Sequence, residues 1–82
     1  MKYKIFNVIE IESGIVIAVT SFVADKDKGE NHIKEIENKA IESFKKRIEN
    51  RLSNNDLIDL ESCVENGYYT DNSNYDIYLS ES

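Results

Sequence analysis

The stretch VIEIESGIVIAV at residues 8–19 decides how this chain begins to fold, because it joins two apolar runs through a turn-forming segment at 12–14. The flanking segments, 2–11 and 15–23, are rich in Ile, Val, Phe and Tyr and contain neither glycine nor proline. Such a composition favours β-strands, and a short connection with glycine favours an antiparallel hairpin. The first third of the sequence is therefore predicted to form two paired strands.

The register of this hairpin depends on the length of its loop. A two-residue turn at Ser13 and Gly14 would place Ile11 opposite Val16. A three-residue loop, with Gly14 in the left-handed conformation, would instead place Ile11 opposite Ile15. We expect the three-residue loop, because it gathers the large apolar side chains on one face and a one-residue slip would exchange the faces.

Alternation in that register gives the hairpin two faces. The predicted core face carries Tyr3, Ile5, Ile9, Ile11, Ile15, Ile17, Val19 and Val23. The opposite face carries Lys4, Phe6, Val8, Glu10, Val16, Ala18, Thr20 and Phe22. Its apolar members, Phe6, Val8, Ala18 and Phe22, are predicted to form a self-association patch, since small soluble proteins seldom leave such a patch open. A homodimer through this patch, or through the edge of the second strand, is the expected consequence.

The middle of the chain has helical spacing. Apolar residues recur from Asn31 onward at Ile33, Ile36, Ala40, Ile41, Phe44, Ile48 and Leu52. The segment SNND, which begins at Ser53, matches a capping box in its aspartate variant, and a second helix is predicted to begin there and to end at Gly67. Finally YDIYLS at 75–80 alternates apolar and polar side chains, which is typical of a strand.

These elements predict a single α+β domain over residues 1–82, with the order β-β-α-α-β. The simplest arrangement is a three-stranded antiparallel sheet with two helices packed on one face. We expect the last strand to lie beside the first, which leaves the second strand at an edge.

The charge of the chain is concentrated at one end. The net charge is −6, and residues 53–82 hold seven Asp and Glu but no Lys or Arg. Direct binding to nucleic acid is disfavoured, because it depends on clustered cations. The longest apolar stretch is far shorter than the ~20 residues of a membrane span. The single cysteine, Cys63, cannot form an internal disulfide, which is typical of a cytoplasmic protein.

No group of residues predicts catalysis or a bound cofactor. His32 is the only histidine, and Cys63 lies beside an apolar stripe in the acidic third, where a nucleophilic thiolate is disfavoured. The segments DKDKGE at 25–30 and DNSNYD at 71–76 have oxygen ligands at alternate positions. Neither has the glycine at position six and the glutamate at position twelve of a calcium loop. The sequence therefore predicts a non-enzymatic protein without a metal or cofactor.

The acidic last third also carries four tyrosines, a residue type that is enriched at interfaces. The candidate partner-binding residues are Glu65, Tyr68, Tyr69, Asp71, Asp76 and Tyr78. Carboxylates between aromatic rings would suit a basic surface on another protein. The alternative is that they form a solvated acidic surface that maintains solubility.

The segment ENGYYTDNSNYDIYLSES at 65–82, together with the size and charge of the chain, resembles small phage-encoded inhibitors of the anti-CRISPR kind. The resemblance implies carboxylates that occupy a nucleic-acid channel of a host nuclease. The expected function is then that of a small acidic protein that covers a basic, nucleic-acid-binding surface of a host defence protein such as a CRISPR effector. The alternative is a structural or regulatory homo-oligomer that assembles through the hairpin face or the edge strand.

Overall fold

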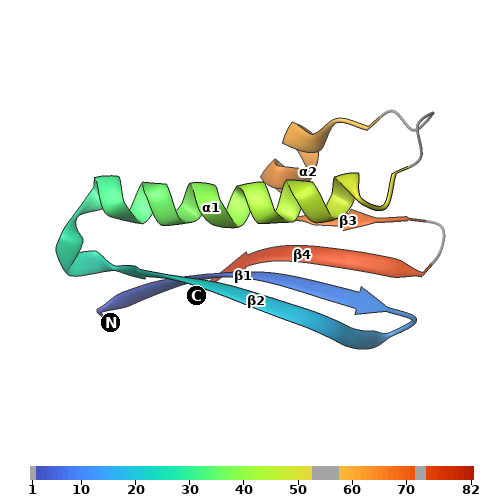
Figure 1. Ribbon diagram of the computed structural model, residues 1–82, viewed down its shortest axis with the longest axis horizontal. Coiled ribbons are helices and arrows are strands. Elements are labelled where there is room, and N and C mark those ends of the chain that lie inside the picture. The colour runs from blue at the N-terminus through green and yellow to red at the C-terminus, as the bar shows by residue number, and fades with distance from the viewer. Residues whose placement is uncertain (1, 53–57, 72–73) are drawn as a thin grey trace.

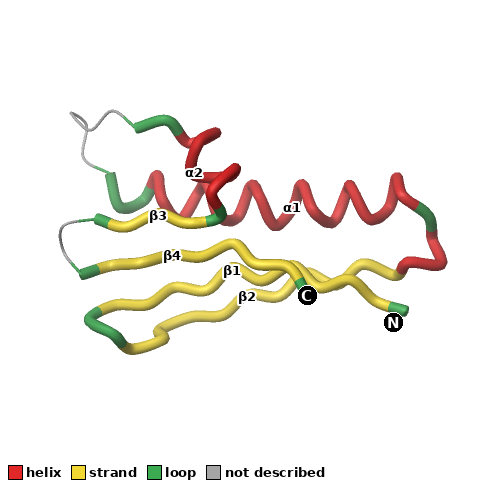
Figure 2. Tube along the Cα trace, turned by 180° about the vertical axis from the view of Figure 1, so that it is seen from behind, coloured by secondary structure: helices red, strands yellow, loops and turns green. Residues whose placement is uncertain are grey.

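A computed structural model describes residues 2–52, 58–71 and 74–82 (Figure 1). The elements are β1 (Tyr3–Glu12), β2 (Ile15–Asp25), the 3₁₀ turn η1 (Lys26–Lys28), α1 (Glu30–Glu49), α2 (Leu60–Asn66), β3 (Tyr68–Thr70) and β4 (Tyr75–Glu81). The strands form one antiparallel sheet in the order β2-β1-β4-β3. Both helices lie on the same side of this sheet, and no described segment covers its other side (Figures 1 and 2).

The α+β class and the place of both helices on one face are thus confirmed. The last strand lies beside the first and β2 is at an edge, as expected. The prediction of three strands is wrong, because a fourth strand, β3, pairs with β4. Only three residues long, β3 is too short for its alternation to be visible in the sequence.

Gly67 explains why β3 follows α2 without a loop. It ends the helix in the left-handed conformation, with φ of 66°. Its backbone lies so close to β4 that a Cβ atom would lie 2.8 Å from the carbonyl oxygen of Leu79. A glycine meets both requirements, since it lacks a Cβ and adopts positive φ without strain. The predicted end of the second helix at Gly67 is confirmed.

The start of that helix differs from the prediction. Asp59 is the N-cap, and its carboxylate accepts hydrogen bonds from the backbone N–H groups of Glu61 and Ser62. The predicted capping box at Ser53 lies outside the described residues. The first helix is close to its expected extent, and its buried positions are Ala40, Phe44 and Ile48.

The observed register of the hairpin differs from the predicted one. Ser13 and Gly14 form a two-residue turn in which φ is 53° and 79°, and two positive φ angles are what a type I′ turn requires. The three-residue loop is therefore wrong. A β-bulge at Ile17 then shifts the register by one residue. Ile11 lies opposite Val16, whereas Glu10 lies opposite Ala18 and Ile9 opposite Val19.

The buried face of the hairpin is also the opposite of the one expected. Phe6 and Val8 are 3% and 1% exposed, and Phe22 packs against both of the core clusters beneath α1. The prediction that Phe6, Val8, Ala18 and Phe22 form an open self-association patch is wrong. The small side chains of Ala18 and Ala24 on this face leave room for a helix to approach the sheet.

Candidate functional site

The sheet face away from the helices, called the open face below, is largely apolar. The strand registers and the alternation of side chains place on it Tyr3, Ile5, Asn7, Ile9, Ile11, Val16, Val19, Ser21, Val23, Asp25, Tyr68, Thr70, Asp76, Tyr78 and Ser80. Val16, Val19 and Val23 are 55%, 57% and 51% exposed, and Tyr3 is 48% exposed. Much of the core face predicted from the sequence is thus the exposed face of the molecule.

Charge is almost absent from the open face. It has no lysine or arginine, and its carboxylates, Asp25 and Asp76, lie near opposite ends of the sheet. The side chains of Asn7 and Ser21, which face each other across β1 and β2, are joined by a hydrogen bond of 2.7 Å from Ser21 Oγ to Asn7 Oδ1. The middle of the face therefore offers mainly apolar contacts, and its Ser21 hydroxyl and Asn7 side-chain oxygen are paired with each other.

Three of the predicted partner-binding residues come together at one border of the open face. The Tyr68 hydroxyl donates a hydrogen bond of 3.1 Å to Asp76 Oδ1, and the ring centroids of Tyr68 and Tyr78 are 4.9 Å apart. Both tyrosines are 38% exposed. The pairing of β3 with β4 brings these side chains together, so they form a small aromatic and acidic cluster.

The other three predicted residues do not join that cluster. Tyr69 packs against the core beneath the helices, and Asp71 accepts a hydrogen bond of 3.1 Å from Arg51 Nη2. Glu65 lies on α2, in the helical layer. The six residues therefore do not form one continuous surface.

Much of the negative charge of the last third is paired within the fold. Beside the Arg51–Asp71 pair, Lys45 Nζ lies 2.6 Å from Glu61 Oε1 and Lys4 Nζ lies 2.8 Å from Glu81 Oε1. Hydrogen bonds from Ser62 hold the pKa of Asp59 below its usual value. Ion pairs with Lys45 and Arg51, near the end of α1, thus account for part of the excess of Asp and Glu in residues 53–82.

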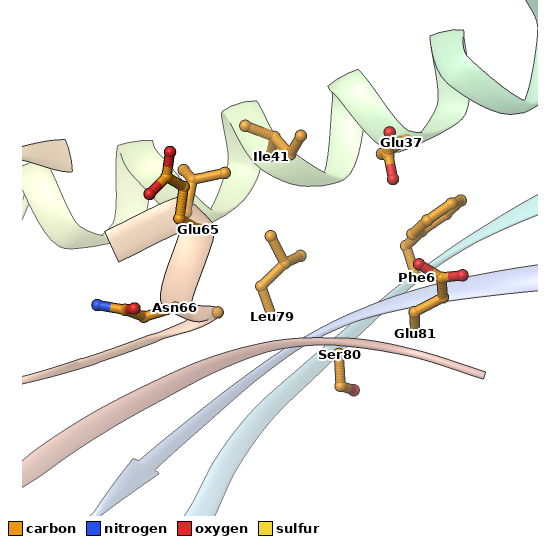
Figure 3. A pocket seen from close by; sticks show the side chains of 10 residues that line it. Phe6, Glu37, Ile41, Glu65, Asn66, Leu79, Ser80 and Glu81 are labelled. Atoms are coloured by element: carbon orange, nitrogen blue, oxygen red, sulfur yellow. The ribbon is translucent and has the colours of Figure 1, made fainter. Parts of the chain in front are cut away.

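A groove with carboxylates at its rim lies between α1, the end of α2 and the end of β4 (Figure 3). Phe6, Ile41, Val64 and Leu79 form its apolar floor, and Glu37, Glu65 and Glu81 stand at its rim. Its volume is about 350 Å³. Figure 3 shows Glu65 at one end of this acidic groove and Glu37 and Glu81 at the other.

A polar network beneath α1 was not predicted from the sequence. Arg47 Nη1 lies 2.6 Å from Glu10 Oε2, and Arg47 Nη2 donates a hydrogen bond of 3.0 Å to Thr20 Oγ1. The Tyr75 hydroxyl donates to the other oxygen of Glu10. Burial and this hydrogen bond raise the pKa of Tyr75 above its ordinary value. Tyr75 is 1% exposed, and the network joins α1 to β1, β2 and β4.

The other candidates for chemistry have structural roles or stand apart. Cys63 packs against the core, and burial raises the pKa of its thiol. His32 lies partly exposed near the start of α1. Asp25 accepts a hydrogen bond of 2.9 Å from the backbone N–H of Asp27, which is a turn-forming role. Part of the 71–76 segment lies outside the described residues.

Within the described ranges, no three His, Cys, Asp or Glu side chains are grouped closely enough to hold a metal ion. Neither of the two described helices is long and apolar enough to span a membrane. Comparison of the chain with protein-family models, curated proteins and solved structures finds no match.

Proposed function

We propose that this protein is a non-enzymatic binding protein that works as a homodimer, in which two open faces pack against each other. The observation that carries the proposal is the exposure of Val16, Val19 and Val23, each more than half exposed on one face of the sheet. Contiguous apolar patches of this kind usually mark an interface in a small protein.

The size of the open face supports a partner as large as a second copy. A ten-residue strand such as β1 is about 33 Å long, and three neighbouring strands with their side chains are about 15 Å wide. Two such faces in contact would bury on the order of 1,000 Å², which is near the lower limit for a stable interface. A small ligand would leave most of this surface in water.

The charge of the open face favours a second copy over a basic partner. Two chains of net charge −6 repel each other, yet the middle of this face has no charged side chain that would meet its equivalent. A basic surface would find carboxylates only near the ends, at Asp25 and Asp76. Two flat sheets can pack about 10 Å apart around a twofold axis, with β-branched side chains between them.

Replacing Val19 and Val23 together with lysine is expected to give a folded monomer. Both side chains are more than half exposed, so the isolated chain should lose little stability, whereas four lysines would meet in the dimer. The mass in solution, from light scattering or sedimentation, measures the result. Asn38→Lys with Asn50→Lys makes the same change of net charge in the helical layer and should remain a dimer.

A wild-type protein that is monomeric at the highest soluble concentration would refute this proposal. Pairing of two β2 edges is the competing geometry, and it would protect the outward N–H groups of β2 from hydrogen exchange. In the face-to-face dimer those groups continue to exchange while Val19 and Val23 become buried.

A second candidate is an inhibitor of the anti-CRISPR kind, which covers a basic surface of a host nuclease. The observation that favours it is the exposed cluster of Tyr68, Asp76 and Tyr78 at the border of the open face. Asp76→Lys is expected to abolish inhibition of a purified CRISPR nuclease, whereas Asn38→Lys should not affect it. Equal inhibition by the two variants, or none by the wild type, would count against this candidate. Asp71 is less suitable for such a test, because its reversal would also break the pair with Arg51.

A further inference from the structure

We propose that the acidic groove binds a basic segment of another polypeptide, with one arginine or lysine side chain lying along the groove. The proposal does not depend on the dimer, because the groove lies in the helical layer. Its lining comes from α1, the end of α2, β4 and Phe6 of β1, which meet only in the folded chain (Figure 3).

The floor of the groove suits the stem of a long cationic side chain. Ile41 and Val64 approach it from the two helices, and Leu79 approaches it from β4. A volume of about 350 Å³ lies within the range of small ligand sites, ~300–1,000 Å³, near its lower limit. Arginine and lysine bury their aliphatic stems on such surfaces and keep their charged groups at the rim.

The rim has an excess of negative charge. Its three carboxylates come from three elements, and Lys4, which pairs with Glu81, is the cation beside them. Within the described residues, Glu37 and Glu65 form no ion pair, in contrast to Glu61 on the same helix as Glu65. Glu65 is therefore left to pair with a guest cation.

Lys4 shows within this chain how a cation binds at such a rim. Its Nζ lies 2.8 Å from Glu81 Oε1 and 5.6 Å from the centroid of the Phe6 ring. Glu81 and Glu37 both raise the pKa of Lys4, which reflects the negative potential at that end of the groove. A guest side chain would make the equivalent contacts at the other end, with its charge on Glu65 and its stem on Val64 and Leu79.

The test uses two acetylated and amidated peptides, Gly-Leu-Arg-Leu-Gly and Gly-Leu-Gln-Leu-Gly, titrated into the full chain and followed by amide chemical shifts. The arginine peptide should shift the amides of Ile41, Val64, Gly67 and Leu79 in a saturable way. The glutamine peptide should bind about fivefold more weakly or not measurably, because the ion pair is lost. Added salt should weaken the binding of the arginine peptide, since ion pairs between partly exposed charges are screened.

The variant Glu37→Gln with Glu65→Gln should reduce binding of the arginine peptide to the level of the glutamine peptide. Glu35→Gln with Glu49→Gln removes the same charge from exposed positions on α1 outside the groove and should leave binding unchanged. Equal binding of both peptides, or shifts that spread over the open face instead, would overturn the proposal. The lysine variants at Val19 and Val23 should bind the arginine peptide as the wild type does, which separates this site from the dimer.

Discussion

Replacing Phe44 by alanine is expected to lower the free energy of unfolding by about 3–5 kcal/mol, a large part of the total for a domain of this size. Phe44 is 0% exposed and belongs to the core cluster that includes Val8 and Ile77. Its removal would leave a cavity that the long helix above the sheet cannot close without moving. Urea denaturation followed by circular dichroism measures the loss.

Ile9→Ala is the informative comparison for Phe44→Ala. From the sequence, both residues are core positions, and either truncation should lower the free energy of unfolding by about 2–5 kcal/mol. The structure places Ile9 on the open face, partly exposed, so its truncation should lower the stability of the monomer by only about 1 kcal/mol. Both truncations should be measured in the variant that carries lysine at Val19 and Val23, because a dimer would add to the apparent stability of the wild type. Equal losses in the two truncations would show that the open face is covered within one chain.

The elements of this fold could be predicted because their periodicity is local. Alternation at the hairpin and in the last strand, and helical spacing from Asn31, each depend on neighbours within a few residues. The end of α2 at Gly67 likewise follows from the freedom of one residue to adopt positive φ. The predicted β-β-α-α-β order is correct for that reason, except that it lacks the short β3.

The buried face of the hairpin could not be predicted in the same way, since both faces carry large apolar side chains. The choice depends on the fit of α1, for which small residues such as Ala18 and Ala24 make room. Glu10 and Thr20 suggested a solvent-exposed face, but they are partners of Arg47, which follows more than twenty residues later. The bulge at Ile17 also changed the register in a way that no local pattern indicated.

The candidate sites depend still more on long-range contacts. Tyr68, Asp76 and Tyr78 were selected from composition, and the structure brings them together through the pairing of β3 with β4. The acidic groove combines Glu37, Glu65 and residues at the end of β4, and no spacing in the sequence connects them. Composition indicated an acidic surface, whereas only the fold shows which carboxylates are already paired.

Arg47→Met is expected to lower the free energy of unfolding by about 3 kcal/mol, at the lower end of the range for breaking a buried ion pair. The lower end applies because the Arg47 side chain is 33% exposed, whereas that of Glu10 is 13% exposed. Methionine keeps much of the volume of the arginine stem, so the loss arises mainly from Glu10. The Glu10 carboxylate would remain beneath α1, and of the network only the Tyr75 hydroxyl would still donate a hydrogen bond to it. Urea denaturation at neutral pH measures the effect.

The double variant Arg47→Met with Glu10→Gln separates lost packing from an uncompensated charge. Glutamine is neutral, and its side-chain oxygen can still accept the hydrogen bond from Tyr75. If the cost of Arg47→Met is the stranded carboxylate, the double variant should recover most of the loss, and the two substitutions should be strongly non-additive. A double variant as unstable as the sum of the single ones would mean that Arg47 acts through its contacts with Thr20 and the helix. In that case, the Arg47–Glu10 ion pair would not be the interaction that keeps α1 on this face of the sheet.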